Sequence, residues 1–253
     1  MKYLKDVKEI FENSSEDNWQ DLVNEYKLDN RKCVQKIVSK YEKKIFNVER
    51  ERKRVHRLIN FDNQFLINHN CIYGIDEVGR GPLAGPVVSV CITLPKDLFI
   101  AGVNDSKKIN VEKRIELSEI IKEKAIDISI GICSAKEIDE INILRATCRS
   151  MEKAFEGIKN KADILLVDGN TRIDVPVAQE TIVKGDSKSM AIACASIVAK
   201  VYRDDLMSEY DDIYPQYHFK NNKGYGTIEH IEAIRKYGLL DIHRRSFVKN
   251  ICQ

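Results

Sequence analysis

Several features that organise other classes of protein are missing from this sequence. No apolar run approaches the roughly 20 residues that a membrane-spanning helix needs, and the segment Met1 to Lys5 lacks the apolar stretch of a secretory signal. The seven cysteines, at 33, 71, 91, 133, 148, 194 and 252, show no Cys-x-x-Cys spacing, so neither a disulfide framework nor a zinc site is indicated. We therefore expect a cytoplasmic protein in a reducing compartment, with its cysteines buried as small apolar residues.

The five histidines are also too dispersed to suggest a metal site; they stand at positions 56, 69, 218, 230 and 243. His243 lies beside Arg244 and Arg245, and we expect it to make a polar contact near the C-terminus. The chain has 253 residues and 43% apolar composition, which is typical of a globular protein with one domain of ordinary size and a smaller module.

The net charge of +2 hides a strong local asymmetry. Residues 31–57 hold eleven Lys and Arg against three acids, an excess of +8. Such a segment is either a surface that faces phosphates or the solvated face of a helix.

The first 60 residues follow a helical pattern. Asp29 and Asn30 are good cap residues, and after them apolar side chains recur with a period close to 3.6 from Val34 to Ile59. Ser14 and Ser15 can cap a shorter helix before it. We predict a small all-helical, basic N-terminal domain of three segments over residues 1–68.

From Cys71 onward, short β-branched runs punctuated by glycine indicate strands. We predict strands at 71–77, 86–94, 127–133, 163–168 and 180–184, and helices at 111–125, 135–157, 189–211 and 227–237. The first three strands come almost in series, whereas the later ones alternate with helices. The fold class predicted for residues 69–253 is therefore α/β, with a mixed five-stranded sheet flanked by helices and a helical C-terminal region.

Four carboxylates stand at the ends of predicted strands. Asp76 and Glu77 end the first strand, Asp168 ends the fourth, and Asp186 follows the fifth. Acids are depleted in strands, and several of them at one edge of a sheet repel one another unless a cation neutralises them. Oxygen ligands without His or Cys favour Mg²⁺ or Mn²⁺.

The alternative is that each acid only caps a turn, because Asp168-Gly169-Asn170 and Gly185-Asp186-Ser187 are both good turn sequences. Asp76 and Glu77 also pose a geometric difficulty, since successive strand residues face opposite ways. We expect both to serve one site only if the strand bulges or ends there, which the glycines that follow permit.

The glycine-rich run from Val78 to Gly85 superficially fits a dinucleotide fingerprint. That fingerprint must open a helix, however, and here Pro86 leads straight into a strand. A P-loop is excluded because no Lys-Ser or Lys-Thr closes the run. The run therefore predicts a turn whose backbone N–H groups approach a ligand closely, with Arg80 available for phosphate.

At these residues the chain resembles ribonuclease HII, and the resemblance covers about residues 71–250. An intact Gly79-Arg80-Gly81 favours this family over its relative ribonuclease HIII, in which that tripeptide differs. The motifs that carry the resemblance are, in order, Gly74-Ile75-Asp76-Glu77-Val78-Gly79-Arg80-Gly81-Pro82, Asn104-Asp105-Ser106-Lys107-Lys108, Val167-Asp168-Gly169-Asn170, Val183-Lys184-Gly185-Asp186-Ser187, Ala199-Lys200-Val201-x-Arg203-Asp204, Lys223-Gly224-Tyr225-Gly226-Thr227 and His243-Arg244-Arg245-Ser246-Phe247.

The resemblance implies a ribonuclease H-like fold, hydrolysis with two metal ions, and a catalytic and metal-binding set made of Asp76, Glu77, Asp168 and Asp186. It also implies that Gly79, Arg80 and Gly81 recognise the ribose 2′-OH through close backbone contact, and that Tyr225 packs on a sugar next to the cut. The candidates for phosphate contact are Ser106, Lys107, Lys184, Lys200 and Arg203.

We thus expect a type 2 ribonuclease H, a metal-dependent endonuclease that cuts the RNA strand of RNA·DNA hybrids and cuts at ribonucleotides embedded in duplex DNA. We expect Mg²⁺ or Mn²⁺ as cofactor, products with 3′-hydroxyl and 5′-phosphate ends, a monomer, and no membrane partner. Two alternatives remain open. One is another nuclease or resolvase of the same superfamily that acts on DNA alone, and the other is a basic nucleic-acid-binding module in which the acids only cap turns.

Overall fold

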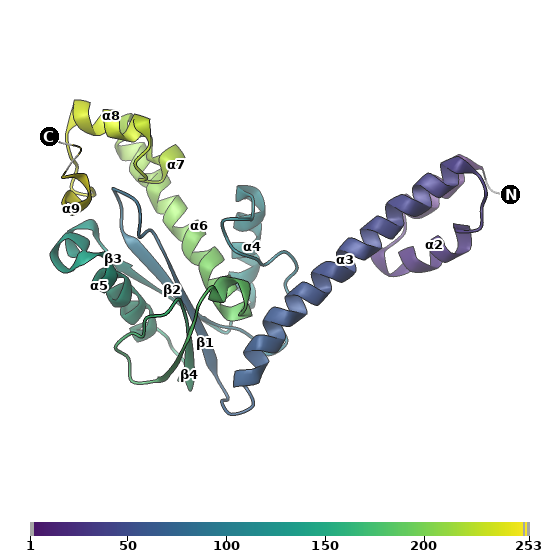
Figure 1. The fold of residues 1–253 in the computed structure, drawn as a ribbon, viewed down its shortest axis with the longest axis horizontal. Helices are drawn as coiled ribbons and strands as arrows, with labels where there is room; N and C mark the ends of the chain where they lie inside the picture. The colour runs from purple at the N-terminus through teal and green to yellow at the C-terminus, as the bar shows by residue number, and fades with distance from the viewer. Residues whose placement is uncertain (1–2, 250, 252–253) are drawn as a thin grey trace. The chain divides into compact units, whose positions relative to one another are not determined.

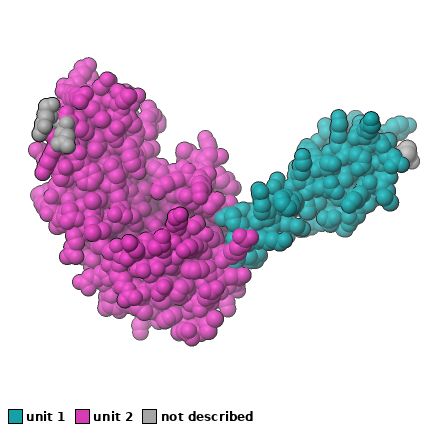
Figure 2. Space-filling view, viewed as in Figure 1, with its two compact units in different colours: residues 1–56 teal, residues 57–253 magenta. Residues whose placement is uncertain are grey.

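The computed structural model describes residues 3–249 and 251, and the chain divides into two compact units, residues 1–56 and 57–253 (Figure 2). The first unit consists of α1 (Leu4–Glu12), α2 (Trp19–Tyr26) and most of α3 (Lys32–Phe65). Its core contains Val7, Phe11, Val23, Tyr26, Val34, Val38 and Tyr41. The predicted helical N-terminal region of three segments is therefore confirmed.

The second unit is built on a five-stranded mixed sheet with the strand order β3-β2-β1-β4-β5 (Figure 1). Strand β1 is central and pairs antiparallel with β2 and parallel with β4. The predicted fold class is confirmed. The strands are β1 (Ile72–Val78), β2 (Val87–Thr93), β3 (Asp127–Cys133), β4 (Ile164–Asp168) and β5 (Ala178–Ile182).

Helices cover both faces of this sheet, with α5 (Ala135–Glu156) on one face and α6 (Met190–Ile213) on the other (Figure 1). Gly74 lets α6 approach β1 closely, because a Cβ there would lie 2.6 Å from the Ala191 backbone. The predicted helix at 135–157 is broken at Asn142, whose φ of 64° is left-handed. The Asn142 side chain accepts hydrogen bonds from the Leu144 and Arg145 N–H groups and so starts the second half of α5.

The last turns of α3 belong to the second unit and support α6. The buried carboxylate of Asp62 accepts a hydrogen bond of 2.8 Å from the Ala191 N–H at the first turn of α6. Burial raises the pKa of Asp62 to about 6. Phe61, Phe65 and Leu66 pack against the apolar cluster under this face of the sheet. The domain boundary at residue 68 stays a prediction, but residues 57–66 make their contacts within the second unit.

The remaining helices are α4 (Val111–Lys124), α7 (Phe219–Asn222), α8 (Ile228–Tyr237) and α9 (Arg245–Val248). Helices α4 and α7 pack against α6. The three C-terminal ones enclose a cluster around Met207, Tyr217 and Phe219 that also includes Ala84 of the glycine-rich turn. This cluster places the C-terminal region beside that turn.

Within residues 3–249 and 251, no helix is both long and apolar enough to cross a membrane. The prediction for the cysteines is only partly correct. Cys91, Cys133 and Cys194 are buried free thiols, whereas Cys33 is exposed. Cys252 lies outside the described residues.

Candidate active site

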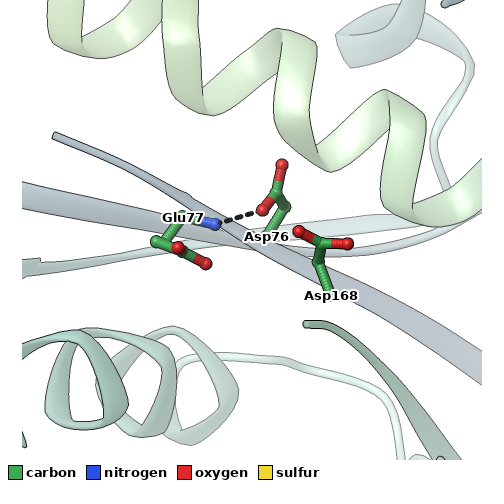
Figure 3. Close-up of side chains that lie close together, drawn as sticks. All are labelled: Asp76, Glu77 and Asp168. Carbon is green, nitrogen blue, oxygen red and sulfur yellow. Dashed lines mark hydrogen bonds between the residues drawn. The ribbon is translucent and has the colours of Figure 1, made fainter. Parts of the chain in front are cut away.

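Three of the four predicted acids converge at the ends of two parallel neighbouring strands. Asp76 and Glu77 lie near the end of β1, and Asp168 is the last residue of β4. Pairing between these strands reaches Ile75 and Val167, so the acids come directly after the last paired residues. Each side chain offers one carboxylate oxygen, and these oxygens all lie within 4.8 Å of one another (Figure 3).

Asp76 and Glu77 share the site because β1 ends there, which is one of the two arrangements that the sequence required. Strand β1 pairs in unbroken register with β2 through its last residue, Val78, so β1 has no bulge, and its pairing with β4 already stops at Ile75. The two side chains leave the strand on opposite sides (Figure 3). The Asp76 carboxylate accepts a hydrogen bond of 2.7 Å from the N–H of the next residue, Glu77. The pairing of β1 with β4 stops at Ile75 and Val167, and the three carboxylates lie together just beyond these residues.

The electrostatics of the three acids favour a bound cation. Burial, followed by the charges of Glu77 and Asp168, raises the pKa of Asp76 well above its ordinary value. Burial also raises the pKa of Glu77, and this rise is opposed by Arg80, whose Nη1 lies 3.4 Å from Glu77 Oε1. Clustered carboxylates with raised pKa values are stabilised when a positive ion replaces their protons.

The donor set fits a hard divalent ion. All three groups in the cluster are carboxylates, and no His or Cys belongs to it among the described residues. Mg²⁺ and Mn²⁺ prefer such oxygen ligands, whereas zinc sites use nitrogen and sulfur. A pocket of about 80 Å³ adjoins the acids and is lined by Glu77, Asp168 and Asn170 among others.

Asp186 lies apart from this cluster. It belongs to the short 3₁₀ turn Gly185–Ser187, and it is half-buried. Burial, then the charges of Asp105 and Asp168, raise the pKa of Asp186. The turn itself is tied to the cluster, because the Gly185 N–H donates a hydrogen bond of 2.6 Å to Asp168 Oδ1. The charge of Asp168 therefore affects the pKa of Asp186, but Asp186 does not belong to the cluster whose oxygens lie within 4.8 Å of one another.

Two buried arginines hold the glycine-rich turn in place. Arg244 has no exposed surface, and its guanidinium donates to the carbonyl oxygens of Gly79, Arg80 and Gly85. Arg203 donates to the carbonyls of Pro86, Ala84 and Lys223 at 3.0 Å each. Gly79 has a φ of 96°, and a Cβ there would lie 2.3 Å from Arg203 Nε, so a side chain cannot be accommodated.

The position of Arg203 does not support the expected phosphate contact. Its side chain is fully buried, and each of its nitrogens already donates to a carbonyl oxygen. A guanidinium in these surroundings supports the turn instead of reaching a ligand. Lys200 is hydrogen-bonded to Asp204 at 2.5 Å and is half-buried.

The other predicted contacts lie in varied surroundings. Lys107 and Lys184 are exposed, whereas Ser106 is buried with its Oγ 3.1 Å from Ser196 Oγ. Lys107 and Lys200 line one open pocket of about 770 Å³. Tyr225 is 44% exposed, and its ring edge lies beside Gly81, 3.5 Å from where a Cβ would be.

Sequence reasoning missed two residues that shape the site. Ser196 lies within the apolar run of α6, and its hydroxyl interacts with the Asp76 carboxylate. Its signal was a polar residue in an otherwise apolar helix. Arg244 stood in a quoted motif but had no assigned role, because burial of an arginine next to Arg245 cannot be read from charge alone.

Two family models match the chain. The one described as ribonuclease HII matches residues 73–250, and the one described as ribonuclease HII N-terminal domain matches residues 4–66. The ribonuclease HII of Clostridioides difficile (strain 630) is 49% identical over 251 residues, which cover 99% of this chain and 98% of that protein. The ribonuclease HII of Caldanaerobacter subterraneus subsp. tengcongensis is 54% identical over 81% of this chain and 85% of that protein.

Solved structures share the fold of the second unit. The crystal structure of the ribonuclease H2 from Pyrococcus horikoshii OT3 has a TM-score of 0.60 at 24% identity, covering 72% of this chain and 97% of that one. A crystal structure of Bst-RNase HIII in complex with Mn²⁺ has a TM-score of 0.58 at 18% identity, covering 72% of this chain and 70% of that one. At these identities the likeness establishes the fold.

Replacing Asp76 by Asn should raise the thermal stability of the metal-free protein. The amide keeps the size of the side chain and removes a buried charge that its neighbours repel. A gain of about 1 kcal/mol would raise Tm by roughly 2–4 °C in a domain of this size. The measurement is thermal unfolding in a chelator and again in Mn²⁺, which should raise Tm of the parent more than that of Asp76→Asn.

The control for this experiment is Asp241→Asn, which removes an exposed acid outside the site. It should leave both Tm values and the response to Mn²⁺ unchanged. A lower Tm for Asp76→Asn without metal, together with a parent-like response to Mn²⁺, would contradict the assignment of Asp76 to a metal site.

Proposed function

The chain belongs to the ribonuclease HII family and is therefore a metal-dependent endoribonuclease that acts on RNA in RNA·DNA hybrids, and we propose that it works with two metal ions and also cuts at single ribonucleotides in duplex DNA. The observation that carries the proposal is the cluster of Asp76, Glu77 and Asp168 next to a glycine-rich turn. An anionic site beside a turn that approaches a ligand closely suits hydrolysis of a phosphodiester at a chosen sugar.

We assign the metal ions, Mg²⁺ or Mn²⁺, to Asp76, Glu77, Asp168 and Asp186. When bound, such ions lower the pKa of a water and stabilise the charge that develops on the leaving oxygen. Asp76 is the most buried of these acids and lies on the central strand, so it would be the acid that contacts both ions. Asp186 lies beyond the 4.8 Å group, and it would hold an ion from the side of the Gly185–Ser187 turn.

The remaining residues bind and orient the substrate in this proposal. Gly79, Arg80 and Gly81 contact the ribose 2′-OH through the backbone, which requires only one ribose. Tyr225 packs on the neighbouring sugar, and its half-exposed ring beside Gly81 supports that role. Lys107 and Lys200 contact phosphates along the pocket that they share. Ser106 and Lys184 are the other two residues that we assign to phosphate contact. Products are a 3′-hydroxyl and a 5′-phosphate.

We further propose that the chain acts as a monomer in the cytoplasm. All assigned residues come from the second unit of one chain, so no second copy is needed to complete the site. The substrate would be found with the genomic DNA, and the relatives named above with curated sequences are bacterial proteins.

The test of the function is cleavage of three matched duplexes in Mg²⁺ or Mn²⁺. One is an RNA·DNA hybrid, one is DNA with a single ribonucleotide, and one is DNA only. We expect cutting of the first two, with a 5′-phosphate on the downstream product, and no cutting of the third. Asp168→Asn should bind all three like the parent but cleave almost nothing, because the amide loses the charge that binds metal.

The outcomes separate the alternatives. Cutting of the DNA-only duplex would indicate a DNA nuclease of the same superfamily. Binding of all three without cutting by the parent protein would indicate a nucleic-acid-binding module. Parent-like cleavage by Asp168→Asn would remove that residue from the site.

The basic segment of residues 31–57 belongs to a predicted N-terminal domain, residues 1–68, whose role we propose to be duplex binding. Lys36, Lys40 and Lys43 are all exposed, and their spacing puts them on one face of α3. A row of lysines at this spacing can neutralise successive phosphates and release their counterions.

Exchange of these three lysines for Gln should flatten the salt dependence of binding. Each lost phosphate contact lowers the slope of log K against log[salt] by roughly 0.9 on a duplex. The measurement is binding to one RNA·DNA hybrid between low and physiological salt, in Ca²⁺ to suppress cutting. The control is Lys159→Gln with Lys161→Gln, two exposed lysines before β4, at the opposite end of that strand from Asp168. Equal slopes for all three proteins would mean that the basic helix does not touch the substrate.

A further inference from the structure

Two buried histidines near the C-terminus face each other. His230 lies in α8 and His243 lies in the segment before α9, and both are almost completely buried. Their Nε2 atoms are 3.1 Å apart. They are surrounded by the rings of Tyr217 and Phe219, at centroid distances between 5.2 and 6.4 Å.

The hydrogen bonds at the outer ends of the pair fix where its protons lie. The Leu240 N–H donates to His243 Nδ1 at 2.9 Å, so that nitrogen carries no proton. His230 Nδ1 lies 2.8 Å from the Tyr225 carbonyl oxygen, which only accepts, so His230 Nδ1 carries a proton. A neutral imidazole has one N–H, and therefore His243 Nε2–H donates to His230 Nε2. Every ring nitrogen of the pair is satisfied in this single arrangement.

The pair remains neutral at ordinary pH. Burial lowers the pKa of His230, and burial together with the neighbouring His230 lowers the pKa of His243 to about 4. Protonation of His230 at Nε2 would bring two N–H groups face to face at 3.1 Å, and protonation of His243 at Nδ1 would set an N–H against the Leu240 N–H at 2.9 Å. The chain of donors from Leu240 to Tyr225 is thus directional.

The acceptor at the end of this chain belongs to the predicted sugar-packing residue. The Tyr225 carbonyl oxygen accepts from His230 and, at 2.8 Å, from the Thr227 N–H. Just before it, the Gly224 carbonyl oxygen accepts from the Leu83 and Ala84 N–H groups of the glycine-rich turn. The backbone of Tyr225 is therefore fixed from both sides, while its ring remains exposed beside Gly81.

We propose that His230 is a positioning residue for ribose recognition, which it serves by donating from Nδ1 to the Tyr225 carbonyl, and that His243 keeps it in the required tautomer. This inference rests on the proposed function, because it takes Tyr225 as the residue that packs on the sugar next to the cut. The alternative is that the pair only fills the C-terminal core. The positioning role depends on the Nδ1–H that donates to Tyr225, whereas the core-filling role does not single out this nitrogen over Nε2.

Two isosteric variants separate the roles of these two nitrogens. In His230→Asn the amide nitrogen occupies the place of Nδ1, so the donor to Tyr225 is kept and the acceptor for His243 is lost. In His230→Gln the amide reaches the place of Nε2, so the acceptor is kept and the donor to Tyr225 is lost. His230→Asn leaves a buried His243 N–H without an acceptor, whereas in His230→Gln the Tyr225 carbonyl still accepts from Thr227.

The positioning role predicts opposite orders of stability and activity. His230→Asn should have the lower Tm of the two but a kcat/KM on the single-ribonucleotide duplex within about twofold of the parent, because the donor that acts on Tyr225 is intact. His230→Gln should be the more stable variant yet lose kcat/KM by about fivefold or more, as expected for one lost hydrogen bond that places a stacking residue. A core-filling role predicts that activity follows Tm, and that result would overturn the proposal.

A double-mutant cycle with Tyr225→Ala links the effect to Tyr225. Tyr225→Ala should lower kcat/KM by about tenfold, and His230→Gln should then add less than about twofold. If Tyr225→Ala lowers kcat/KM but the His230→Gln effect persists in full, the positioning proposal fails while the sugar-packing role stands. If Tyr225→Ala cuts every duplex like the parent, the sugar-packing role fails, and the positioning proposal fails with it.

Nitrogen NMR of the parent protein tests the tautomers without a variant. With ¹⁵N-labelled imidazoles, His230 should be protonated at Nδ1 and His243 at Nε2, both neutral at pH 7. Protonation of His230 at Nε2 would mean that nothing is donated to Tyr225, and would overturn the proposal.

Discussion

Repulsion among carboxylates held at the ends of two adjacent parallel strands is the constraint on which the site depends. Asp76, Glu77 and Asp168 cannot move apart, because β1 is the central strand and its neighbours fix it on both edges. Burial of Asp76 on the face of the sheet that α6 covers makes its charge still less favourable. A divalent cation offsets both the repulsion between the carboxylates and the cost of burying their charge. The cluster is therefore unfavourable without metal and favourable as a metal site. The sheet holds the three acids in place, and their negative charge favours binding of a cation.

The C-terminal region serves a different purpose, which is to hold irregular backbone in a fixed shape. The glycine-rich turn and the Tyr225 loop contain carbonyl groups that no strand or helix satisfies. Arg203 and Arg244 donate hydrogen bonds to carbonyls of the turn, and His230 donates one to a carbonyl of the loop. Loss of either arginine would leave desolvated carbonyls behind, which makes the shape of the turn costly to change. The backbone that would face the ribose is therefore held in place before substrate arrives.

Regular structure and the three clustered acids were predictable from sequence, whereas the supporting polar contacts were not. The periodicity of apolar residues placed every strand to within about two residues, because burial on a sheet leaves a direct pattern. It could not reveal that Arg203 is buried, since an arginine carries the same charge on the surface and in the core. The break at Asn142 depends on a side chain that caps a helix from within. Asp186 followed a strand like the other acids, but its distance from Asp168 is set by a 3₁₀ turn that no period encodes.

The most direct test of the account is to locate Mn²⁺ by anomalous diffraction in crystals of the protein with an RNA·DNA hybrid that resists hydrolysis. We expect two peaks roughly 4 Å apart, both within coordination distance of the acidic cluster, with Asp76 contacting each ion. We also expect the scissile phosphate beside them and the ribose against Gly79 to Gly81. A bound hybrid whose phosphate lies at this turn, with no Mn²⁺ peak between Asp76, Glu77 and Asp168, would contradict it.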